Sequence, residues 1–369
     1  MRIGIDARLV YYSQAGIGQY IRRLTEGLTQ VAPQRDQFVL LHSRKDPTIL
    51  NGKFQRHDLW TPSHHQLERW VLPIEIALAG LDVLHSPDFI PPFHGTTRSV
   101  ITVHDLAFLL YPHFLTPEHA RYYSQIDQAV RRTDHIIAVS RSTKNDLIRL
   151  LGVSEDRITV IHEAVSRRFR RVEDAAALLA LRQRYSLPTA FILFVSTIEP
   201  RKNLPTLLRA YGRLREDYKV EAPLVVVGKQ GWLFEDVFAT LERLNLGDHV
   251  RFLGRVPTEE VVLLYNAAAV HVHPAYYEGF GLPPLEAMTC GTPTIVSNVA
   301  SLPEVVGDAG LLIEPEDVEG WAVAMHRVLS DPALRAQMRE KGLRRAAAFS
   351  LERMARETLA VYEKVGIRQ

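Results

Sequence analysis

Short apolar runs that alternate with longer amphipathic stretches restrict the fold of this chain more than any other feature. Each run has the length of one β-strand, and the stretch that follows it has room for a helix or a crossover. Such alternation is typical of βαβ units, in which successive strands lie parallel in one sheet. The expected strands are residues 2–7, 38–42, 83–86, 99–103, 135–139, 158–161, 191–195, 223–227, 250–253, 269–273, 294–297 and 310–313. Helices are expected at residues 19–31, 204–214, 233–244, 259–268, 318–329, 332–348 and 351–365, and one more from residue 284.

The length of 369 residues exceeds what one hydrophobic core usually organises, which predicts two domains. After residue 161 the strand pattern gives way to a basic segment, 166–171, that we interpret as a solvated linker rather than a contact for a polyanion. We predict an N-terminal Rossmann-like domain at 1–168 and a second at 169–348, each a doubly wound parallel sheet. Residues 349–369 are expected to form a helix that packs back on the first domain. The ligand-binding edges of the two domains are expected to face a central cleft.

Composition excludes several classes of protein. An apolar fraction of 46% is that of a globular chain, and a formal charge of only +2 makes nucleic acid an unexpected partner. No stretch of about eighteen uncharged apolar residues is present, and the N-terminal residues lack the pattern of a secretory signal. The single cysteine, Cys290, is expected to be buried, and His64 and His65 have no partners at metal-ligand spacing. We therefore expect a cytoplasmic protein without a metal site.

Two features of the first half lie at the carboxyl ends of predicted strands, where parallel sheets bind ligands. The loop after the first strand contains Gly16 and Gly18 and suits a phosphate-facing turn. It is only part of a dinucleotide fingerprint, because no glycine follows three residues later. His104 follows the strand at 99–103 and is either a site residue or a core or capping histidine. Asp105 either orients His104 or caps the next helix.

A pair of adjacent cations, Arg201 and Lys202, follows the first strand of the second half and precedes a helix. Fixed guanidinium and ammonium groups at the N-terminus of a helix offset the charge on a diphosphate. Adjacent basic residues are also common on solvated surfaces, so the pair alone leaves both interpretations open. A second anion-binding element at the same sheet edge favours the functional one.

That second element is the segment 277–286, Tyr-Glu-Gly-Phe-Gly-Leu-Pro-Pro-Leu-Glu, which joins a strand to a helix. Gly279 and Gly281 leave backbone N–H groups uncovered, and the positive end of the helix dipole adds to their effect. Such a corner suits an anion or a hydroxyl-rich ligand. Two carboxylates, Glu278 and Glu286, lie on either side of it with seven residues between them. The simpler alternative is a tight turn followed by a glutamate that favours the helix dipole.

Together these segments resemble the retaining glycosyltransferase family 4, whose members have the GT-B fold. The resemblance rests on Glu278 and Glu286 within Glu-Gly-Phe-Gly-Leu-Pro-Pro-Leu-Glu-Ala-Met, on Arg201 and Lys202 within Glu-Pro-Arg-Lys-Asn, and on the Gly-x-Gly near the N-terminus. It covers nearly the whole chain and is most specific at residues 277–303. It implies an α/β protein of the GT-B fold with hexosyltransferase activity.

The resemblance also implies roles for individual residues, with the donor bound mostly by the second domain. The catalytic positions that it implies are His104 beside the anomeric centre, Arg201 and Lys202 on the diphosphate, and Glu278 on the sugar hydroxyls. The donor-binding positions that it implies are Gly16, Gly18, Gly228, Lys229, Arg255, Gly279, Phe280, Gly281, Leu282 and Glu286. Of these, Glu286 would hydrogen-bond the ribose, and Gly228, Lys229 and Arg255 would lie near the base.

The implied reaction is transfer of a hexose to a hydroxyl group with retention of anomeric configuration and with no metal or other cofactor. The motif versions present here are similar to those of bacterial mannosyltransferases, so GDP-mannose is the expected donor; a UDP-sugar with glucose, galactose or N-acetylglucosamine is the alternative. The acceptor would be a saccharide or a lipid-linked chain. Basic residues of the first half would permit contact with an anionic membrane surface, but solvated helix faces explain them equally well: Arg22, Arg23, Arg131 and Arg132.

Rival functions belong to other classes of protein. A nucleotide-sugar 2-epimerase shares the two-domain architecture but not the glutamate corner with the cation pair. A nicotinamide-dependent oxidoreductase is disfavoured by the incomplete glycine fingerprint, and a non-catalytic sugar-nucleotide binding protein remains a further alternative.

Two positions depart from the family pattern, Ala15 and Ser196, each where glycine is common. Neither departure removes a charged group.

Overall fold

The computed structural model describes residues 1–12, 16–48, 50, 53–63, 68–91, 97–114 and 123–367, with only the backbone of Arg69 and Ile367. Ala15, His64 and His65 lie outside these residues. The chain divides into two compact units, the first formed by Met1–Ala164 with Phe349–Gln369 and the second by Val165–Ala348. The N-terminal segment of the first unit thus ends at residue 164, whereas the sequence suggested 168. The residues from 349 onward belong to the first unit as well.

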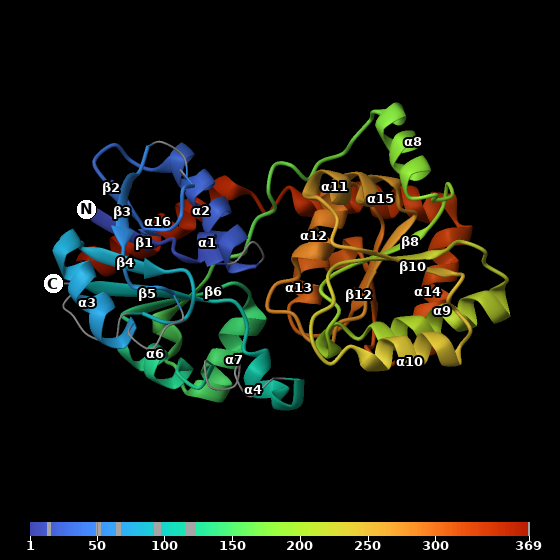
Figure 1. The fold of residues 1–369 in the computed structure, drawn as a ribbon, viewed down its shortest axis with the longest axis horizontal. Helices are drawn as coiled ribbons and strands as arrows, with labels where there is room; N and C mark the ends of the chain where they lie inside the picture. Colours follow the sequence, from blue (N-terminus) through green and yellow to red (C-terminus); the bar gives the residue numbers. More distant parts are fainter. Residues whose placement is uncertain are drawn as a thin grey trace. The chain divides into compact units, whose positions relative to one another are not determined.

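The first unit contains, within its described residues, a seven-stranded parallel sheet (Figure 1). Its strands are β1 (Arg2–Asp6), β2 (Gln37–Ser43), β3 (Gln55–Leu59), β4 (Val83–Ser86), β5 (Arg98–Val103), β6 (His135–Ala138) and β7 (Ile158–Val160). Their order is β3-β2-β1-β4-β5-β6-β7, so the direction in which strands are added reverses between β1 and β4. The sequence analysis missed β3, because this edge strand is mostly polar and has no apolar alternation.

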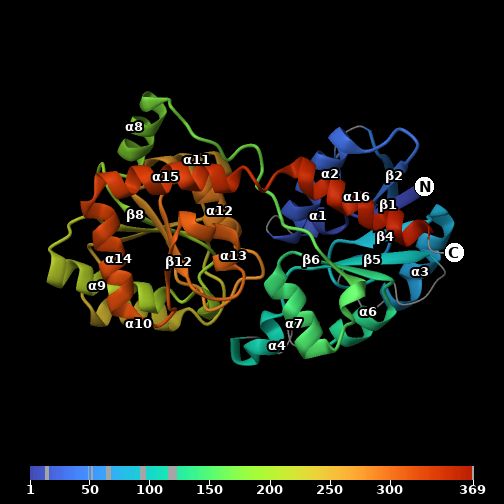
Figure 2. The same ribbon diagram turned by 180° about the vertical axis from the view of Figure 1, so that it is seen from behind.

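Helices cover both faces of this sheet (Figures 1 and 2). They are α1 (Leu9–Tyr12), α2 (Ile17–Val31), α3 (Glu68–Ala79), α4 (Ala107–Leu110), α6 (Ile126–Arg132), α7 (Arg141–Leu151) and α16 (Leu351–Ile367), with short 3-10 helices η1 (Pro112–Phe114) and η2 (Glu155–Arg157). Neighbouring residues of a strand point to opposite faces, so Ile137 packs in the core with α2 and α16 while Ile136 packs with α6 and α7.

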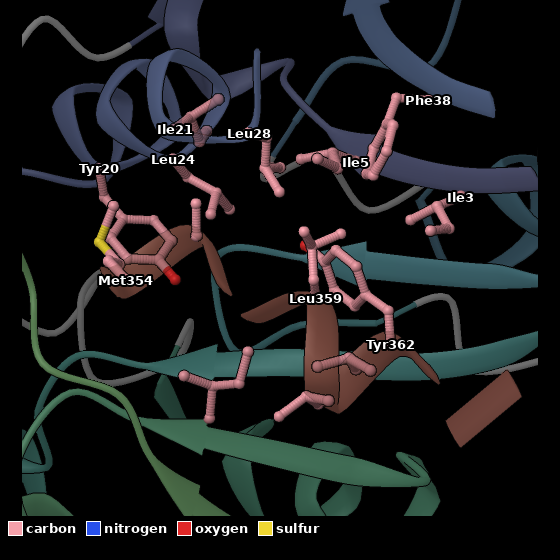
Figure 3. Close-up of a cluster of buried hydrophobic side chains, with 14 of the residues drawn as sticks. Ile3, Ile5, Tyr20, Ile21, Leu24, Leu28, Phe38, Met354, Leu359 and Tyr362 are labelled. Carbon is pink, nitrogen blue, oxygen red and sulfur yellow. The ribbon is translucent and has the colours of Figure 1, made fainter. Parts of the chain in front are cut away.

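Helices α2 and α16 share one hydrophobic core above β1 (Figure 3). Tyr20, Leu24 and Leu28 of α2, which recur at helical spacing, are all buried in it. Helix α16 contributes Leu359 and Tyr362 among others. The C-terminal helix is therefore an integral part of the core of the first unit.

The second unit contains, in its described residues, a six-stranded parallel sheet. Its strands are β8 (Ile192–Val195), β9 (Leu224–Val227), β10 (Val250–Gly254), β11 (Val270–His273), β12 (Thr294–Ser297) and β13 (Leu311–Ile313), in the order β10-β9-β8-β11-β12-β13. The helices are α8 (Ala175–Arg184), η3 (Pro200–Lys202), α9 (Leu204–Tyr218), α10 (Glu235–Arg243), α11 (Thr258–Ala267), α12 (Leu282–Thr289), α13 (Leu302–Val306), η4 (Gly307–Ala309), α14 (Val318–Ser330) and α15 (Pro332–Ala346). Cys290 is buried and is not part of a disulfide, and burial raises the pKa of its thiol to about 12.

The strand order reverses between β8 and β11 in the second unit, as it does between β1 and β4 in the first. In open parallel sheets, ligands bind beyond the carboxyl ends of the strands at such reversal points. The segments that follow these four strands are therefore the ones that the fold offers for a site.

Among the described helices, none has both the length and the apolar character needed to cross a lipid bilayer.

The packing of α2 on α16 predicts the effect of adding one methyl group at Gly27. A Cβ atom at Gly27 would lie 2.5 Å from the carbonyl oxygen of Leu351, a backbone atom of α16 that has no room to move aside. We expect Gly27→Ala to lower the free energy of unfolding by about 1–3 kcal/mol, as overpacking does. The measurement is the urea midpoint followed by tryptophan fluorescence.

The matched control is Gly212→Ala, in the interior of α9. A Cβ atom there meets only Leu244 Cδ1 at 3.9 Å, so the better helix propensity of alanine should leave stability unchanged or raise it by up to about 1 kcal/mol. Equal effects of the two substitutions would show that α16 does not pack closely on α2.

Candidate functional site

The segments that follow β8 and β11 come together because these strands are neighbours in the sheet. After β8 the chain forms η3 and then α9, and after β11 a loop leads to α12. The amide N–H of Tyr276, in that loop, donates to the carbonyl of Arg201 in η3 at 2.9 Å. The side chain of Asn203, at the start of α9, donates to the carbonyl of Pro274 at 3.1 Å. These bonds hold the two segments side by side.

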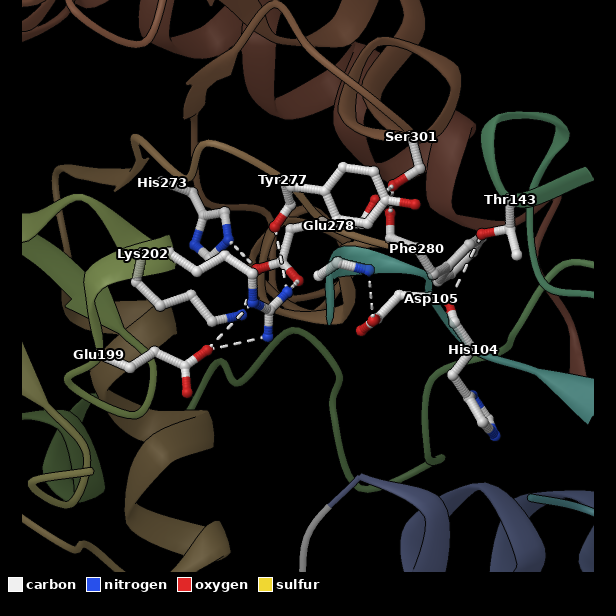
Figure 4. Close-up of polar contacts among 12 residues, drawn as sticks. His104, Asp105, Thr143, Glu199, Lys202, His273, Tyr277, Glu278, Phe280 and Ser301 are labelled. Atoms are coloured by element: carbon white, nitrogen blue, oxygen red, sulfur yellow. Dashed lines mark hydrogen bonds and ion pairs between the residues drawn. The ribbon is translucent and has the colours of Figure 1, made fainter. Parts of the chain in front are cut away.

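The carboxylate of Glu278 is the centre of this region (Figure 4). The residue is only 7% exposed. The carboxylate accepts hydrogen bonds from Lys202 Nζ at 2.5 Å, His273 Nε2 at 2.7 Å and Arg201 Nη1 at 3.2 Å. Burial alone would raise the pKa of this carboxyl group, but Lys202, Arg201 and His273 outweigh burial and hold it well below its usual 4.5. Glu278 is therefore negatively charged near neutral pH.

Arg201 is shared between two carboxylates. In addition to Glu278, its Nη2 donates to Glu199 Oε1 at 2.9 Å, and its Nη1 donates to the carbonyl of Tyr277 at 3.1 Å. Lys202, 8% exposed, has Glu278 as its ion-pair partner. No acidic partner was predicted for these two cations, whereas the structure pairs each with a carboxylate. The formal charges of the two cations, Glu199 and Glu278 cancel.

His273, the last residue of β11, contributes a neutral imidazole. Its Nε2 must carry the proton shared with Glu278, because a carboxylate only accepts. Its Nδ1 is buried and has no hydrogen-bond partner among the described residues. Burial lowers the pKa of His273, and Lys202 and Arg201 lower it further, although Glu278 acts in the opposite direction. His273 thus orients Glu278 without adding charge.

The glycine corner before α12 depends on Gly281. This residue has a φ of 100°, and a Cβ atom there would lie 2.8 Å from Leu302 Cδ2, so only glycine fits without strain. It precedes α12, and no side chain caps that helix. Pro283 and Pro284 have no N–H, so in the first turn of α12 Leu282 supplies the remaining early donor. The helix itself offers fewer donors to an anion than the sequence analysis assumed.

The two glutamates of the motif have different environments. The hydroxyl of Ser301 lies 2.8 Å from the carbonyl oxygen of Glu278 and 2.7 Å from that of Phe280, and it fixes the loop that carries Gly279 between them. Glu286, half-buried in α12, accepts from the hydroxyl of Tyr265 at 3.3 Å. Glu278 thus accepts from two cations and a neutral histidine, whereas Glu286 accepts from a neutral hydroxyl.

The positions proposed for the base follow β9, which is next to β8 in the sheet, and β10, which is next to β9. Gly228 has a φ of 147°, and a Cβ atom there would overlap the carbonyl oxygen of Ser196. Backbone packing therefore requires glycine at this position whether or not a ligand binds. Lys229 and Arg255 are exposed at the ends of their strands. Their contact with a base stays a prediction.

In the first unit, helix α2 begins at Ile17, so Gly18 lies inside the helix and not in the preceding loop. Gly16 has a φ of 49° and accepts the amide N–H groups of Gln19 and Tyr20, each at 3.0 Å. No described side chain caps the helix, and a Cβ atom at Gly16 would meet no described atom within 4 Å. The N-terminus of α2 thus follows β1, beside the reversal point of this sheet.

His104 follows β5 and is held at both ring nitrogens. Its Nδ1 lies 3.0 Å from Glu163 Oε1, and its Nε2 lies 2.9 Å from the carbonyl oxygen of Pro87, which follows β4. Asp105 has the capping role that the sequence allowed, because its carboxylate accepts the amide N–H of Ala107 at the start of α4 at 3.0 Å.

Sequence analysis did not assign several residues of these contacts: Glu163, Glu199, His273 and Ser301. His273 ends β11 and Glu163 follows β7, so their position at strand ends was a usable signal. Glu199 lies in the Glu-Pro-Arg-Lys-Asn motif and Ser301 in residues 277–303, but neither was given a role of its own. Arg23, grouped above with surface cations, is only 5% exposed and donates to Glu163, so it cannot face a membrane. The described residues contain no group of three or more His, Cys, Asp or Glu side chains that could hold a metal ion.

Comparison with known proteins identifies the class. Residues 15–169 match the family described as Glycosyltransferase Family 4, and residues 182–345 match Glycosyl transferases group 1. The O-antigen chain mannosyltransferase B of Escherichia coli is 32% identical over 382 residues, which cover 98% of this chain and 100% of the relative. The chain belongs to glycosyltransferase family 4 and is a glycosyltransferase.

Solved structures show the same architecture. Sucrose-phosphate synthase from Thermosynechococcus elongatus superposes with a TM-score of 0.78 at 23% identity, over 99% of this chain and 98% of its own. HepE from Anabaena, in complex with UDP and glucose, gives a TM-score of 0.76 at 17% identity, over 99% and 100%. These matches confirm the α/β GT-B class with two Rossmann-like domains.

The buried ion pair between Lys202 and Glu278 predicts a strong energetic coupling. We expect Lys202→Met to lower the free energy of unfolding by about 3–5 kcal/mol, because it leaves a buried carboxylate short of a cation. Glu278→Gln in the same chain should restore part of the loss. The measurement is a double-mutant cycle by urea unfolding at neutral pH.

The control is an ion pair of the same unit that lies in solvent, between Arg168 and Glu259, with side chains 68% and 71% exposed. Arg168→Met should change stability little. Additive effects of the Lys202 and Glu278 substitutions would contradict the pairing described here.

Proposed function

We propose that this enzyme transfers a hexose from a nucleotide sugar, with GDP-mannose as donor, to a hydroxyl of a saccharide or lipid-linked acceptor. The transfer retains the anomeric configuration and requires no metal ion. The observation that carries the proposal is the buried carboxylate of Glu278, fixed by Lys202, Arg201 and His273 at the reversal point of the second sheet. The mannosyltransferase named above supports the choice of sugar.

The hydrogen bonds of Glu278 leave room for a sugar hydroxyl. A carboxylate offers about four acceptor positions. Two on Oε1 are taken by Lys202 and His273, and one on Oε2 is taken by Arg201. The remaining position on Oε2 can accept the O–H of a donor sugar, as the family resemblance implies. The rigid contacts of the carboxylate hold this acceptor in one direction before the ligand binds.

The diphosphate of the donor would be held by Lys202 and Arg201. The ammonium group of Lys202 has three N–H donors and uses one for Glu278, so two remain for phosphate oxygens. The paired carboxylates make the ligand-free site neutral, which lowers the cost of keeping two cations buried. The start of α12 at Gly281 and Leu282, which no described side chain caps, would add the positive end of a helix dipole.

The proposed chemistry is a front-face displacement. The bond between the anomeric carbon and the phosphate oxygen breaks as the acceptor oxygen bonds to the same face of that carbon, and the acceptor proton passes to the departing phosphate. Fixed cations and dipoles stabilise the charge that develops on the diphosphate. We assign no nucleophile, because the carboxylate of Glu278 is already bound by three donors and is poorly placed to attack, unlike the free carboxylate of a retaining glycosidase.

Binding and transfer assays distinguish the proposed reaction from other donors and other activities. A UDP-sugar is the main alternative, and the HepE structure named above was solved with UDP and glucose. A 2-epimerase would convert the donor without an acceptor, and a non-catalytic binding protein would bind it without turnover. A cytoplasmic location and contact with a membrane surface stay predictions.

Donor preference can be measured by thermal shift with GDP-, UDP-, ADP- and TDP-sugars. A ligand at about 100 times its Kd stabilises the folded state by about 2.7 kcal/mol, and we expect GDP-mannose to give the largest rise in Tm. Lys202→Ala should abolish most of that rise relative to the Tm of the variant alone. Lys341→Ala, which removes a lysine paired with Asp308, is the control and should keep the full shift. A full shift in the Lys202 variant would remove this residue from the donor site.

Metal dependence and stereochemistry can be measured in one transfer assay. We expect EDTA to leave the turnover number unchanged, because side-chain cations and backbone dipoles stabilise the leaving diphosphate. Proton NMR of the first product should show the anomeric configuration of the donor. Loss of activity that manganese restores, or an inverted product, would contradict the proposed mechanism.

A further inference from the structure

A buried charged cluster beside His104 is unused by the chemistry described so far. Its centre is Glu163, which follows β7 and is 5% exposed. The carboxylate contacts His104 Nδ1 at 3.0 Å through Oε1 and Arg23 Nη2, from α2, at 3.3 Å through Oε2. Three segments far apart in the sequence therefore meet on one carboxylate. Figure 4 shows His104 at the end of β5.

The hydrogen-bond partners of His104 determine its protonation. A carbonyl oxygen and a carboxylate oxygen only accept, and His104 faces one of each, at Pro87 and Glu163. Both ring nitrogens must then carry a proton, which describes an imidazolium cation and not a neutral tautomer. We infer that Glu163 is a positioning residue that keeps His104 as an imidazolium, so that His104 serves the transfer as a fixed positive charge and not as the base that deprotonates the acceptor.

The groups that face His104 support this state from several elements. From α2, the ring of Tyr20 packs edge-on against His104 with centroids 4.9 Å apart, and Arg23 binds the far side of Glu163. After β4, Asp88 acts on His104 through its negative charge. His85, in β4, has a pKa lowered to about 3 by burial and by the charge of His104, so it stays neutral. Asp105, next in the chain, caps α4.

The two pKa values agree with the geometry. Burial lowers the pKa of His104, but the hydrogen bond and the charge of Glu163 outweigh it, so the pKa lies above the usual 6.5. Burial raises the pKa of Glu163, but His104 and Arg23 outweigh it, so the pKa lies below the usual 4.5. The raised histidine pKa stabilises the fold fully below pH 6.5 and ceases to do so as pH rises through the folded value. The lowered carboxyl pKa stabilises the fold above pH 4.5 and ceases to do so as pH falls through its folded value.

The charge of the cluster has a chemical consequence. Arg23, His104 and Glu163 together carry one net positive charge, and the side chain of His104 is the most exposed of the three at 20%. That side chain presents a cation at the carboxyl edge of the first sheet, where it favours negative charge on a ligand. An imidazolium cannot take up a proton, so the proton of the acceptor hydroxyl must go elsewhere. This inference rests on the proposed function, which assigns that proton to the departing phosphate.

Histidine NMR tests the protonation state directly, with ring-labelled histidine and His104→Asn to assign the signal. In the wild-type enzyme we expect both ring nitrogens of His104 to be protonated near neutral pH. In Glu163→Gln we expect the pKa of His104 to fall, because the charge that raised it is gone. A neutral His104 in the wild-type enzyme near neutral pH would overturn the inference, even if the variant fails to fold.

The dependence of kcat on pH gives a second measurement. If Glu163 only stabilised the fold, its substitution would not change the shape of this pH dependence. We expect kcat of Glu163→Gln to be about 10- to 100-fold lower than wild type on the alkaline side, with a smaller loss at acid pH, so that the alkaline limb moves to lower pH. The matched control is Asp46→Asn, which removes the carboxylate from another buried histidine contact, His42 to Asp46 at 3.2 Å. Its pH profile should keep the wild-type shape. A uniform loss in Glu163→Gln at all pH values would overturn the inference.

The two proposals fail separately. If no sugar nucleotide is transferred but His104 is doubly protonated in a Glu163-dependent way, the proposed function fails, while the finding that Glu163 keeps His104 protonated stands. If transfer proceeds while His104 is neutral, the positioning role fails and the proposed function stands.

Discussion

The second unit depends on one constraint: a carboxylate buried at the end of a sheet needs donors on both oxygens. Glu278 obtains them from η3, through Lys202 and Arg201, and from the last residue of β11, His273. Removing any of these donors would leave a charge in a medium that solvates it poorly. The same contacts orient the oxygen that the proposal assigns to the donor sugar, so stability and binding rest on one set of bonds.

The first unit repeats the arrangement with the opposite result for its histidine. Glu163, like Glu278, is a buried carboxylate bound by an arginine and a histidine; here Arg23 comes from α2, and His104 follows β5. His273 stays neutral because burial, Lys202 and Arg201 oppose its protonation. For His104, Arg23 binds the opposite oxygen of Glu163, and the second ring nitrogen faces the carbonyl oxygen of Pro87. His104 therefore gains a proton. Two similar sets of residues thus provide a neutral orienting group in one unit and a cation in the other.

Much of the fold was predictable, because buried parallel strands must be continuous apolar runs and amphipathic helices must separate them. This is why β1, β8 and β11 were expected close to where they lie. Two kinds of element were harder to predict. The edge strand β3 is mostly polar, and helix α13 is too short for helical periodicity to show. Helix α2 began before its predicted start because Gly16, not Gly18, ends the preceding loop.

The sequence by itself indicated candidate residues for the site. Glu278, the Arg201–Lys202 pair and His104 follow predicted strands, and strand ends can be read from local apolar patterns. Only the tertiary structure decided their charge states and partners. Glu278 is distant from Lys202 in the chain, as Glu163 is from both His104 and Arg23, and each contact exists because strand order brings separate segments to one sheet edge. Protonation depends on burial and on neighbours a few ångströms away, and local sequence specifies neither.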